Sequence, residues 1–161
     1  PEPEPEPEPE PTPDPIWGTN RSDNLSGTDG DDTITGVSSR GSRARNLGAR
    51  QIDTLTGLGG ADLFLLGDNR GLFYNDRNQR KLGTRDYARI TDFNANEGDK
   101  LQLRKDIQYV QVFDARNNAL RLYWDRDRDG QLDASRRNSD ELIAVLDNVS
   151  ELNMGADVQF L

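Results

Sequence analysis

Aspartate and glycine recur at fixed places in a nine-residue period near the start of the chain. Four segments have glycine first, aspartate sixth and a large apolar residue eighth: 18–26, 27–35, 48–56 and 57–65. The aspartates are Asp23, Asp32, Asp53 and Asp62, and the apolar residues are Leu25, Ile34, Leu55 and Phe64. Calcium prefers oxygen ligands from carboxylates and backbone carbonyls. Glycine permits the positive φ angles that point successive carbonyls at one spot. The pattern therefore indicates calcium binding.

A later run of acids offers calcium ligands in a different arrangement. Four aspartates and a glycine fall at places 1, 3, 5, 9 and 6 of a loop of the EF-hand type, namely Asp125, Asp127, Asp129, Asp133 and Gly130. The last ligand place holds Arg136 instead of glutamate, and the flanking segments have the composition of strands, so the segment is not an EF-hand. We expect either a hairpin loop that binds calcium with Asp140 or Glu141, or a simple polar turn.

Composition narrows the enzymatic chemistry that these residues could perform. The sequence contains no cysteine and no histidine, which removes zinc–thiolate sites, disulfides and most catalytic triads and proton shuttles. Only a pair of carboxylates, as in a glycosidase, would remain. The well-spaced acids are better explained as calcium ligands, so we expect this chain not to be an enzyme. An enzyme domain could still lie upstream in a larger parent protein.

The first fifteen residues differ from the rest of the chain. Residues 1–15, PEPEPEPEPEPTPDP, alternate proline with acids and contain no base, which predicts an extended polyproline II linker. Much of the net charge of −9 lies there, and a chain with this balance is not expected to bind nucleic acid. No apolar run approaches the ~18 residues of a membrane span.

A period this short, with one inward-facing apolar residue per repeat, is typical of a solenoid. The four segments match the pattern GGxGxDxUx and resemble the RTX, or haemolysin-type, calcium-binding repeat. This resemblance implies a short parallel β-roll over 16–68, in which two repeats form one coil. Residues 36–47, GVSSRGSRARNL, interrupt the pattern as an insertion. We therefore interpret 36–53 as one long turn, so that 27–32 stacks on 57–62 and 18–23 stacks on 48–53.

The RTX pattern implies two sets of calcium ligands. At one edge, the resemblance assigns the carboxylates of Asp32 and Asp62 and the carbonyls of Thr28, Gly30, Gly57 and Gly59. At the opposite edge, it assigns the carboxylates of Asp23 and Asp53 and the carbonyls of Thr19, Arg21, Gly48 and Arg50. The second site is expected to be weaker, because Arg21 and Gln51 stand where the pattern has glycine. If the insertion instead forms its own half-coil, Asp32 would pair with Asp53.

The remaining residues, 69–161, are expected to form an antiparallel β region. Aromatic and β-branched residues with partial alternation predict strands at 87–93, 101–103, 109–113, 120–124, 142–146 and 158–161. The region resembles the segments that follow the repeats in secreted bacterial RTX proteins, including serralysin-type C-terminal domains. The closing DVQFL is similar to the uncleaved export signals of that family.

These features together predict a calcium-binding, calcium-dependent folding module of a larger extracellular protein. The RTX resemblance implies that it is secreted through the type I machinery. The alternative is a structural or adhesive module of the cell surface that binds polysaccharide. An arginine cluster in and beside the insertion could contact an anionic glycan, and consists of Arg40, Arg43, Arg45 and Arg50.

Overall fold

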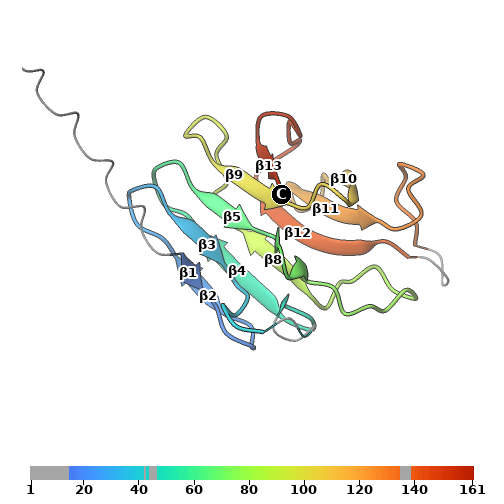
Figure 1. The fold of residues 1–161 in the computed structure, drawn as a ribbon. Helices are drawn as coiled ribbons and strands as arrows, with labels where there is room; N and C mark the ends of the chain where they lie inside the picture. The colour runs from blue at the N-terminus through green and yellow to red at the C-terminus, as the bar shows by residue number, and fades with distance from the viewer. Residues whose placement is uncertain (1–14, 42, 44–46, 135–138) are drawn as a thin grey trace, which may run out of the picture.

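The computed structural model describes residues 15–41, 43, 47–134 and 139–161, and these residues form thirteen strands (Figure 1). The described part has no α-helix, and therefore none long and apolar enough to cross a membrane. The expected all-β class is confirmed. The polyproline prediction for 1–14 and the insertion residues 42 and 44–46, which include Arg45, lie outside the described residues, as does Arg136.

The first sheet consists of five short strands that are all parallel to their neighbours. In spatial order they are β1 (Ile16–Trp17), β3 (Thr33–Thr35), β5 (Leu63–Leu65), β9 (Lys100–Leu103) and β13 (Val158–Phe160). The registers pair Ile16 with Ile34 and Ile34 with Phe64. The apolar residues of successive repeats therefore lie side by side on one face.

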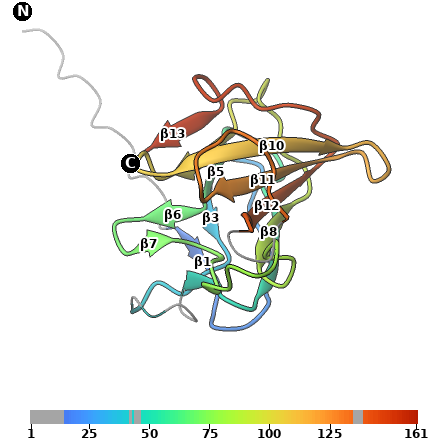
Figure 2. The same ribbon diagram turned by 90° about the vertical axis from the view of Figure 1, so that its right-hand side faces the viewer.

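The second sheet begins with parallel strands and ends with an antiparallel meander. The order is β2 (Asn24–Ser26), β4 (Ile52–Thr56), β8 (Tyr87–Ile90), β12 (Glu141–Asp147), β11 (Ala119–Asp125) and β10 (Gln108–Asp114). The first four are parallel, and the last three are joined by antiparallel pairs. From β1 to β5 the chain changes sheet at every strand. Figure 2 shows the long meander strands above the β6 and β7 hairpin.

The prediction that 69–161 is an antiparallel region is wrong for several of its strands. The predicted strand positions are occupied by β8 to β13, but β8, β9 and β13 pair only in parallel. They extend the two parallel sheets that the repeats begin. Alternation within a strand reports which face is buried, but not which neighbour the strand finds, so pairing could not be deduced from local pattern.

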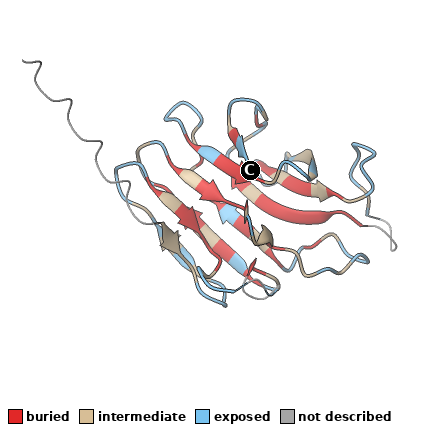
Figure 3. Ribbon diagram, in the orientation of Figure 1, coloured by how far each residue is buried: buried red, intermediate tan, exposed pale blue. Residues whose placement is uncertain are grey.

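The core lies between the two sheets, where the eighth residue of each repeat points inward. Ile34, Leu55 and Phe64 are fully buried, whereas Leu25 in the edge strand β2 is only partly buried. The core continues through Ile90 and Leu101 of the later strands. Figure 3 shows buried residues along the strands and exposed residues in the turns at their ends. The packed sheets therefore fix where the turns begin and end.

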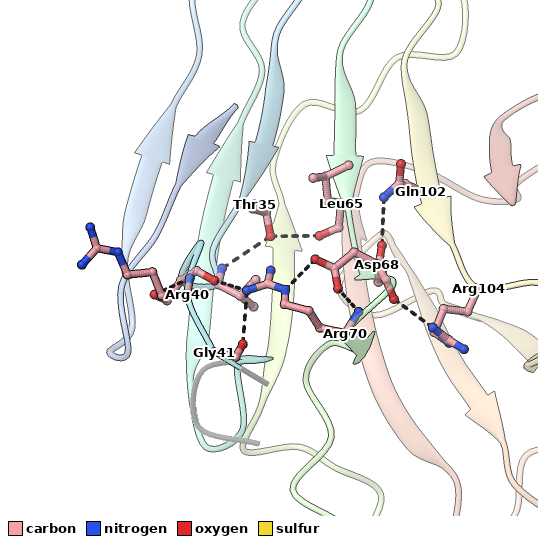
Figure 4. A network of polar contacts seen from close by, with 11 residues as sticks. Thr35, Arg40, Gly41, Leu65, Asp68, Arg70, Gln102 and Arg104 are labelled. Atoms are coloured by element: carbon pink, nitrogen blue, oxygen red, sulfur yellow. Dashed lines mark hydrogen bonds and ion pairs between the residues drawn. The ribbon is translucent and has the colours of Figure 1, made fainter. Parts of the chain in front are cut away.

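The insertion packs against a small hairpin, formed by β6 (Gly67–Asp68) and β7 (Gly71–Leu72). Arg70 in the hairpin donates to the carbonyl of Ser38 at 2.6 Å and pairs with Asp68 at 2.7 Å (Figure 4). The registers of β2 with β4 and of β3 with β5 are those expected if the insertion is one long turn. The alternative pairing of Asp32 with Asp53 is wrong, because their turns serve different sheets.

Candidate metal centres

The turns 27–32 and 57–62 lie against each other at one edge of the first sheet. The Asp32 amide donates to Oδ1 of Asp62 at 2.9 Å, and the Ala61 amide donates to Oδ1 of Asp31 at 2.8 Å. Within its own turn, Asp32 accepts hydrogen bonds from the Thr28 amide and hydroxyl at 2.6 and 2.9 Å. The sixth-place carboxylate thus closes its own turn, and the carboxylate of Asp62 also ties its turn to the preceding coil.

The first glycine of each of these turns is required because the aspartate folds back over it. A Cβ atom on Gly57 would lie 1.9 Å from Oδ2 of Asp62, and one on Gly27 would lie 2.6 Å from Oδ2 of Asp32. A Cβ atom on Gly27 would also lie 2.6 Å from the carbonyl oxygen of Gly57. Carboxylate and carbonyl oxygens of the two turns therefore gather in one small space. Among the carbonyls assigned as calcium ligands, that of Thr28 accepts a hydrogen bond from the Gly59 amide at 3.3 Å. Gly30 and Gly59, whose carbonyls were also assigned, lie in the same two turns.

A third turn, 94–99, extends this stack and was missed by the sequence analysis. The Asp62 amide donates to Oδ1 of Asp99 at 2.9 Å, and the Asn94 amide donates to Oδ2 of Asp99 at 2.8 Å. Asp92 accepts the Gly57 and Leu58 amides at 2.9 and 2.8 Å. The turn has aspartate in the sixth place, but it has asparagine in the first place, where the repeat pattern has glycine. The only sequence signal for this turn was an aspartate directly before a strand, as in the repeats.

The second predicted pair of turns is also brought together, at one edge of the second sheet. The Asp23 amide donates to Oδ1 of Asp53 at 2.8 Å, and the Thr19 amide donates to Oδ2 of Asp23 at 2.7 Å. The other Asp53 oxygen accepts the Tyr74 hydroxyl at 2.8 Å. Among the assigned carbonyls, Gly48 already accepts the Gln51 amide at 3.0 Å. Both oxygens of the Asp53 carboxylate therefore accept hydrogen bonds from the chain itself.

A pocket lies over this second pair of turns. Its lining residues come from both turns and from the loop that precedes β8, and are Thr19, Asn20, Arg21, Ser22, Ala49, Arg50, Gln51 and Asp76. The side chains of Arg21 and Arg50 are exposed, as are those of Arg40 and Arg43. Arg50 has a positive φ of 63°, a backbone conformation that favours glycine.

Burial makes the ionised form of the stacked aspartates costly. Loss of solvent raises the pKa of Asp62 to about 6, and the charges of Asp99, Asp32 and Asp92 add to the increase. Burial likewise raises the pKa of Asp53 to about 6, against hydrogen bonds from the Asp23 amide and Tyr74. The pKa of Asp99 is raised for the same primary reason. A cation among these carboxylates would offset the lost hydration.

The loop 125–133 brings two acids of the predicted EF-like run together with Asp140. Oxygens of Asp125, Asp127 and Asp140 lie within 4.8 Å of one another and could hold a metal ion. The Asp125 carboxylate accepts the amides of Arg128 at 2.6 Å and Gly130 at 2.8 Å. Asp140 joins the group, as one sequence alternative expected. Asp129 and Asp133 do not, although Asp133 donates its amide to Asp140 at 2.8 Å.

A second group of acids was not predicted at all. Oxygens of Asp76, Asp86 and Glu141 lie within 4.8 Å of one another, and this group also could hold a metal ion. Asp86 and Glu141 are fully buried, and burial raises the pKa of each to about 7. These residues share no motif, because Asp76 and Asp86 come from the loop between β7 and β8, whereas Glu141 begins β12 far along the sequence. Glu141, the sequence alternative to Asp140, belongs to this group instead.

Comparison with known proteins adds no family to this description. No model of a known protein family matches the chain, and no curated protein matches it either.

Proposed function

We propose that the chain is a calcium-binding module that folds when calcium binds, and that its two sheets form a short parallel β-roll. The observation that carries the proposal is the ladder of carboxylates between successive turns. In this ladder, the amides of Asp32 and Asp62 donate to the carboxylates of Asp62 and Asp99, each at 2.9 Å. Three buried acids thus stand in adjacent coils at one sheet edge.

Repulsion between these acids supports a role for a cation. Asp32, Asp62 and Asp99 are all at most 8% exposed, and no arginine or lysine forms an ion pair with them among the described residues. Like charges at this spacing disfavour ionisation, and burial adds to that cost. Calcium is suited to such a place, since it accepts six to eight oxygen ligands in flexible geometry.

The small core supports coupling of calcium binding to folding. The strands of the repeats have three to five residues, and each contributes about one fully buried apolar side chain. Ordering a residue costs ~1–2 kcal/mol of backbone entropy, so the short coils gain little from apolar burial alone. An ion that binds only the folded state adds stability as RT ln(1 + [L]/Kd).

This coupling fits a protein that folds outside the cell. Extracellular calcium sites have dissociation constants of about 10⁻⁴–10⁻³ M, so such sites would fill only where calcium is plentiful. Secretion in the unfolded state through a type I exporter is the route that the RTX resemblance implies. In this proposal the carboxylates bind metal and have no catalytic role.

Far-UV circular dichroism with calcium titration tests the proposal on the full chain. We expect a change from disordered to β signal as calcium is added, and reversal by EDTA. Magnesium should substitute poorly, because it requires a smaller octahedral shell. The double variant D32N/D62N should need more calcium for the same change, whereas D106N, which alters an acid at the surface, should not. Full β signal in excess EDTA contradicts the proposal.

A further inference from the structure

The unpredicted acids lie at the same edge of the second sheet as the Asp23 and Asp53 turns. Asp86 immediately precedes β8, and Glu141 is the first residue of β12. β8 and β12 are parallel neighbours, and β8 is also parallel to β4. Their starting ends therefore meet at one edge, where Asp76 enters from the loop between β7 and β8.

The burial and hydrogen bonding of Asp86 indicate more than a chance group of acids. Asp86 is 0% exposed, and neither of its carboxylate oxygens has a hydrogen-bond partner among the described residues. The backbone amides of Arg50 and Asp76 approach it and oppose the increase of its pKa, although neither reaches ordinary hydrogen-bond geometry. Buried carboxylates are normally satisfied, so both oxygens lack the ligand that this position calls for.

The buried acids of the 125–133 loop provide an internal comparison. Asp125 accepts three hydrogen bonds, from the amides of Arg128 and Gly130 and the side chain of Gln108. Asp140 accepts the amides of Arg126 and Asp133. Those carboxylates are stabilised by the protein itself. Asp86 is not, although it is equally buried.

The surrounding charges favour a divalent cation. Three ionised carboxylates contribute −3, and the guanidinium of Arg126 donates to Oε2 of Glu141 and contributes +1. The remaining charge of −2 would be neutralised by one divalent cation. Oxygens on opposite sides of a calcium ion lie about 4.6–5.2 Å apart, so three oxygens within 4.8 Å can contact the same ion.

An ion could reach these residues from solvent. Asp76 is partly exposed and lines the pocket over the second pair of turns. Its Oδ1 accepts the Asn78 amide at 2.7 Å, and its own amide donates to Oε1 of Glu141 at 3.3 Å. Asp76 thus connects the buried acids to the pocket.

We propose that Asp76, Asp86 and Glu141 bind one calcium ion at the edge of the second sheet, in a site separate from the repeat turns. The site does not depend on calcium binding by the repeats, and uses only loop and strand-end residues outside them. It would fix the start of β8 to the start of β12, and so join the repeat strands to the meander.

Equilibrium dialysis with radioactive calcium on the full chain, together with thermal unfolding, tests the site. We expect D86N to bind one ion fewer than the unaltered chain. With calcium in excess, D86N should still show a thermal unfolding transition, because asparagine keeps the shape of the side chain and removes a buried charge without a partner. D76N, at a partly exposed position that tolerates change, should lose the same ion. D106N should lose none.

Two outcomes would overturn this site. One is an unchanged number of bound ions in D76N or D86N, because Asp86 and Glu141 would then share a proton instead of a metal. The other is an equal loss in D106N. Adding D76N to the D32N/D62N background separates this site from the repeats: it should remove one further ion, whether or not the repeats bind calcium.

Discussion

A single aspartate in each repeat makes several contacts that depend on its place in the turn. Oδ2 of Asp32 accepts the amide and hydroxyl of Thr28 within the turn, and Oδ1 of Asp62 accepts the amide of Asp32 from the preceding turn. Asparagine could accept the same bonds, but it would contribute no charge to a cation. In the proposed function, the short acceptor side chain therefore serves the turn and the charge of aspartate serves the ion.

Replacing Asp32 or Asp62 by alanine tests whether the two carboxylates share an ion. Each single change should weaken the same calcium-binding step by about tenfold or more, equal to ~1.4 kcal/mol. The double change should be less than additive, since the residues are in contact. Isothermal titration calorimetry of the four chains measures the coupling. Independent and additive losses would show that the two acids serve different ions.

Alanine at Gly57 tests the close approach of the carboxylate to the backbone. Its Cβ would lie 1.9 Å from Oδ2 of Asp62, so the turn must shift, and we expect a loss of ~1–3 kcal/mol from the calcium-bound form. G30A is the matched control, because its Cβ would meet only the Thr28 hydroxyl at 3.8 Å. Chemical denaturation in calcium compares them. An equal loss in both variants would contradict this account.

At the scale of elements, the turns and loops at the sheet edges bring the acids together. Turn 94–99 joins the first stack because β9 is paired with β5, with Leu63 opposite Lys100. The loop 125–133 closes on Asp140 because β11 and β12 are antiparallel, which places their connecting ends together. Strand pairing thus selects which acids become neighbours.

Asp127 and Asp129 in that loop allow a controlled test of metal binding. Asp127 belongs to the group with Asp125 and Asp140, whereas Asp129, two residues later, does not. If the loop binds calcium, D127N should reduce the number of bound ions by one and D129N should leave it unchanged. Both residues are exposed, so neither change should prevent folding in excess calcium. The same number of ions in D127N would make the loop a polar turn.

At the scale of the whole molecule, buried acids give the metal-free and calcium-bound forms opposite responses to pH. The folded-state pKa is about 6 for Asp53 and Asp62 and about 7 for Asp86 and Glu141, against ordinary values of 3.8 and 4.5. At pH values between the ordinary pKa and the raised folded-state pKa of these acids, the folded metal-free chain binds more protons than the unfolded chain. Its stability therefore falls as the pH rises.

In EDTA, we expect the β signal to increase when the pH is lowered from about 8 to about 5, because protons neutralise the buried acids that oppose folding. With calcium in excess, the same change should lower the unfolding temperature, because protons compete for the carboxylates. Far-UV circular dichroism in EDTA and thermal unfolding in calcium measure the two responses. A loss of β signal in EDTA on lowering the pH would contradict a common set of acids for protons and calcium.

The last strand bears on the proposed export route. Val158 is largely buried in β13, and the terminal Leu161 amide donates to the Leu103 carbonyl at 2.9 Å. In a host with a type I exporter, deletion of 157–161 should prevent secretion, while the purified variant still binds calcium at the repeats. Secretion at the normal level would place the signal elsewhere.

The nine-residue period by itself determined the strands of the repeats and their inward apolar residues. Each of these depends on residues only a few places apart, because glycine first and aspartate sixth close one turn. The insertion left two stackings of the turns open, with Asp32 beside Asp62 or beside Asp53, and the register of β3 with β5 selects the first.

Tertiary structure alone decided the parallel pairing of β8, β9, β12 and β13, the addition of turn 94–99, and the meeting of Asp76, Asp86 and Glu141. These arrangements join segments far apart in the chain, whose local spacing carries no record of their partners. The apolar residues of the later strands are buried equally well in either pairing direction, and only closure of the core between the two sheets selects one. The acids at the strand ends are then brought together by the strands that carry them.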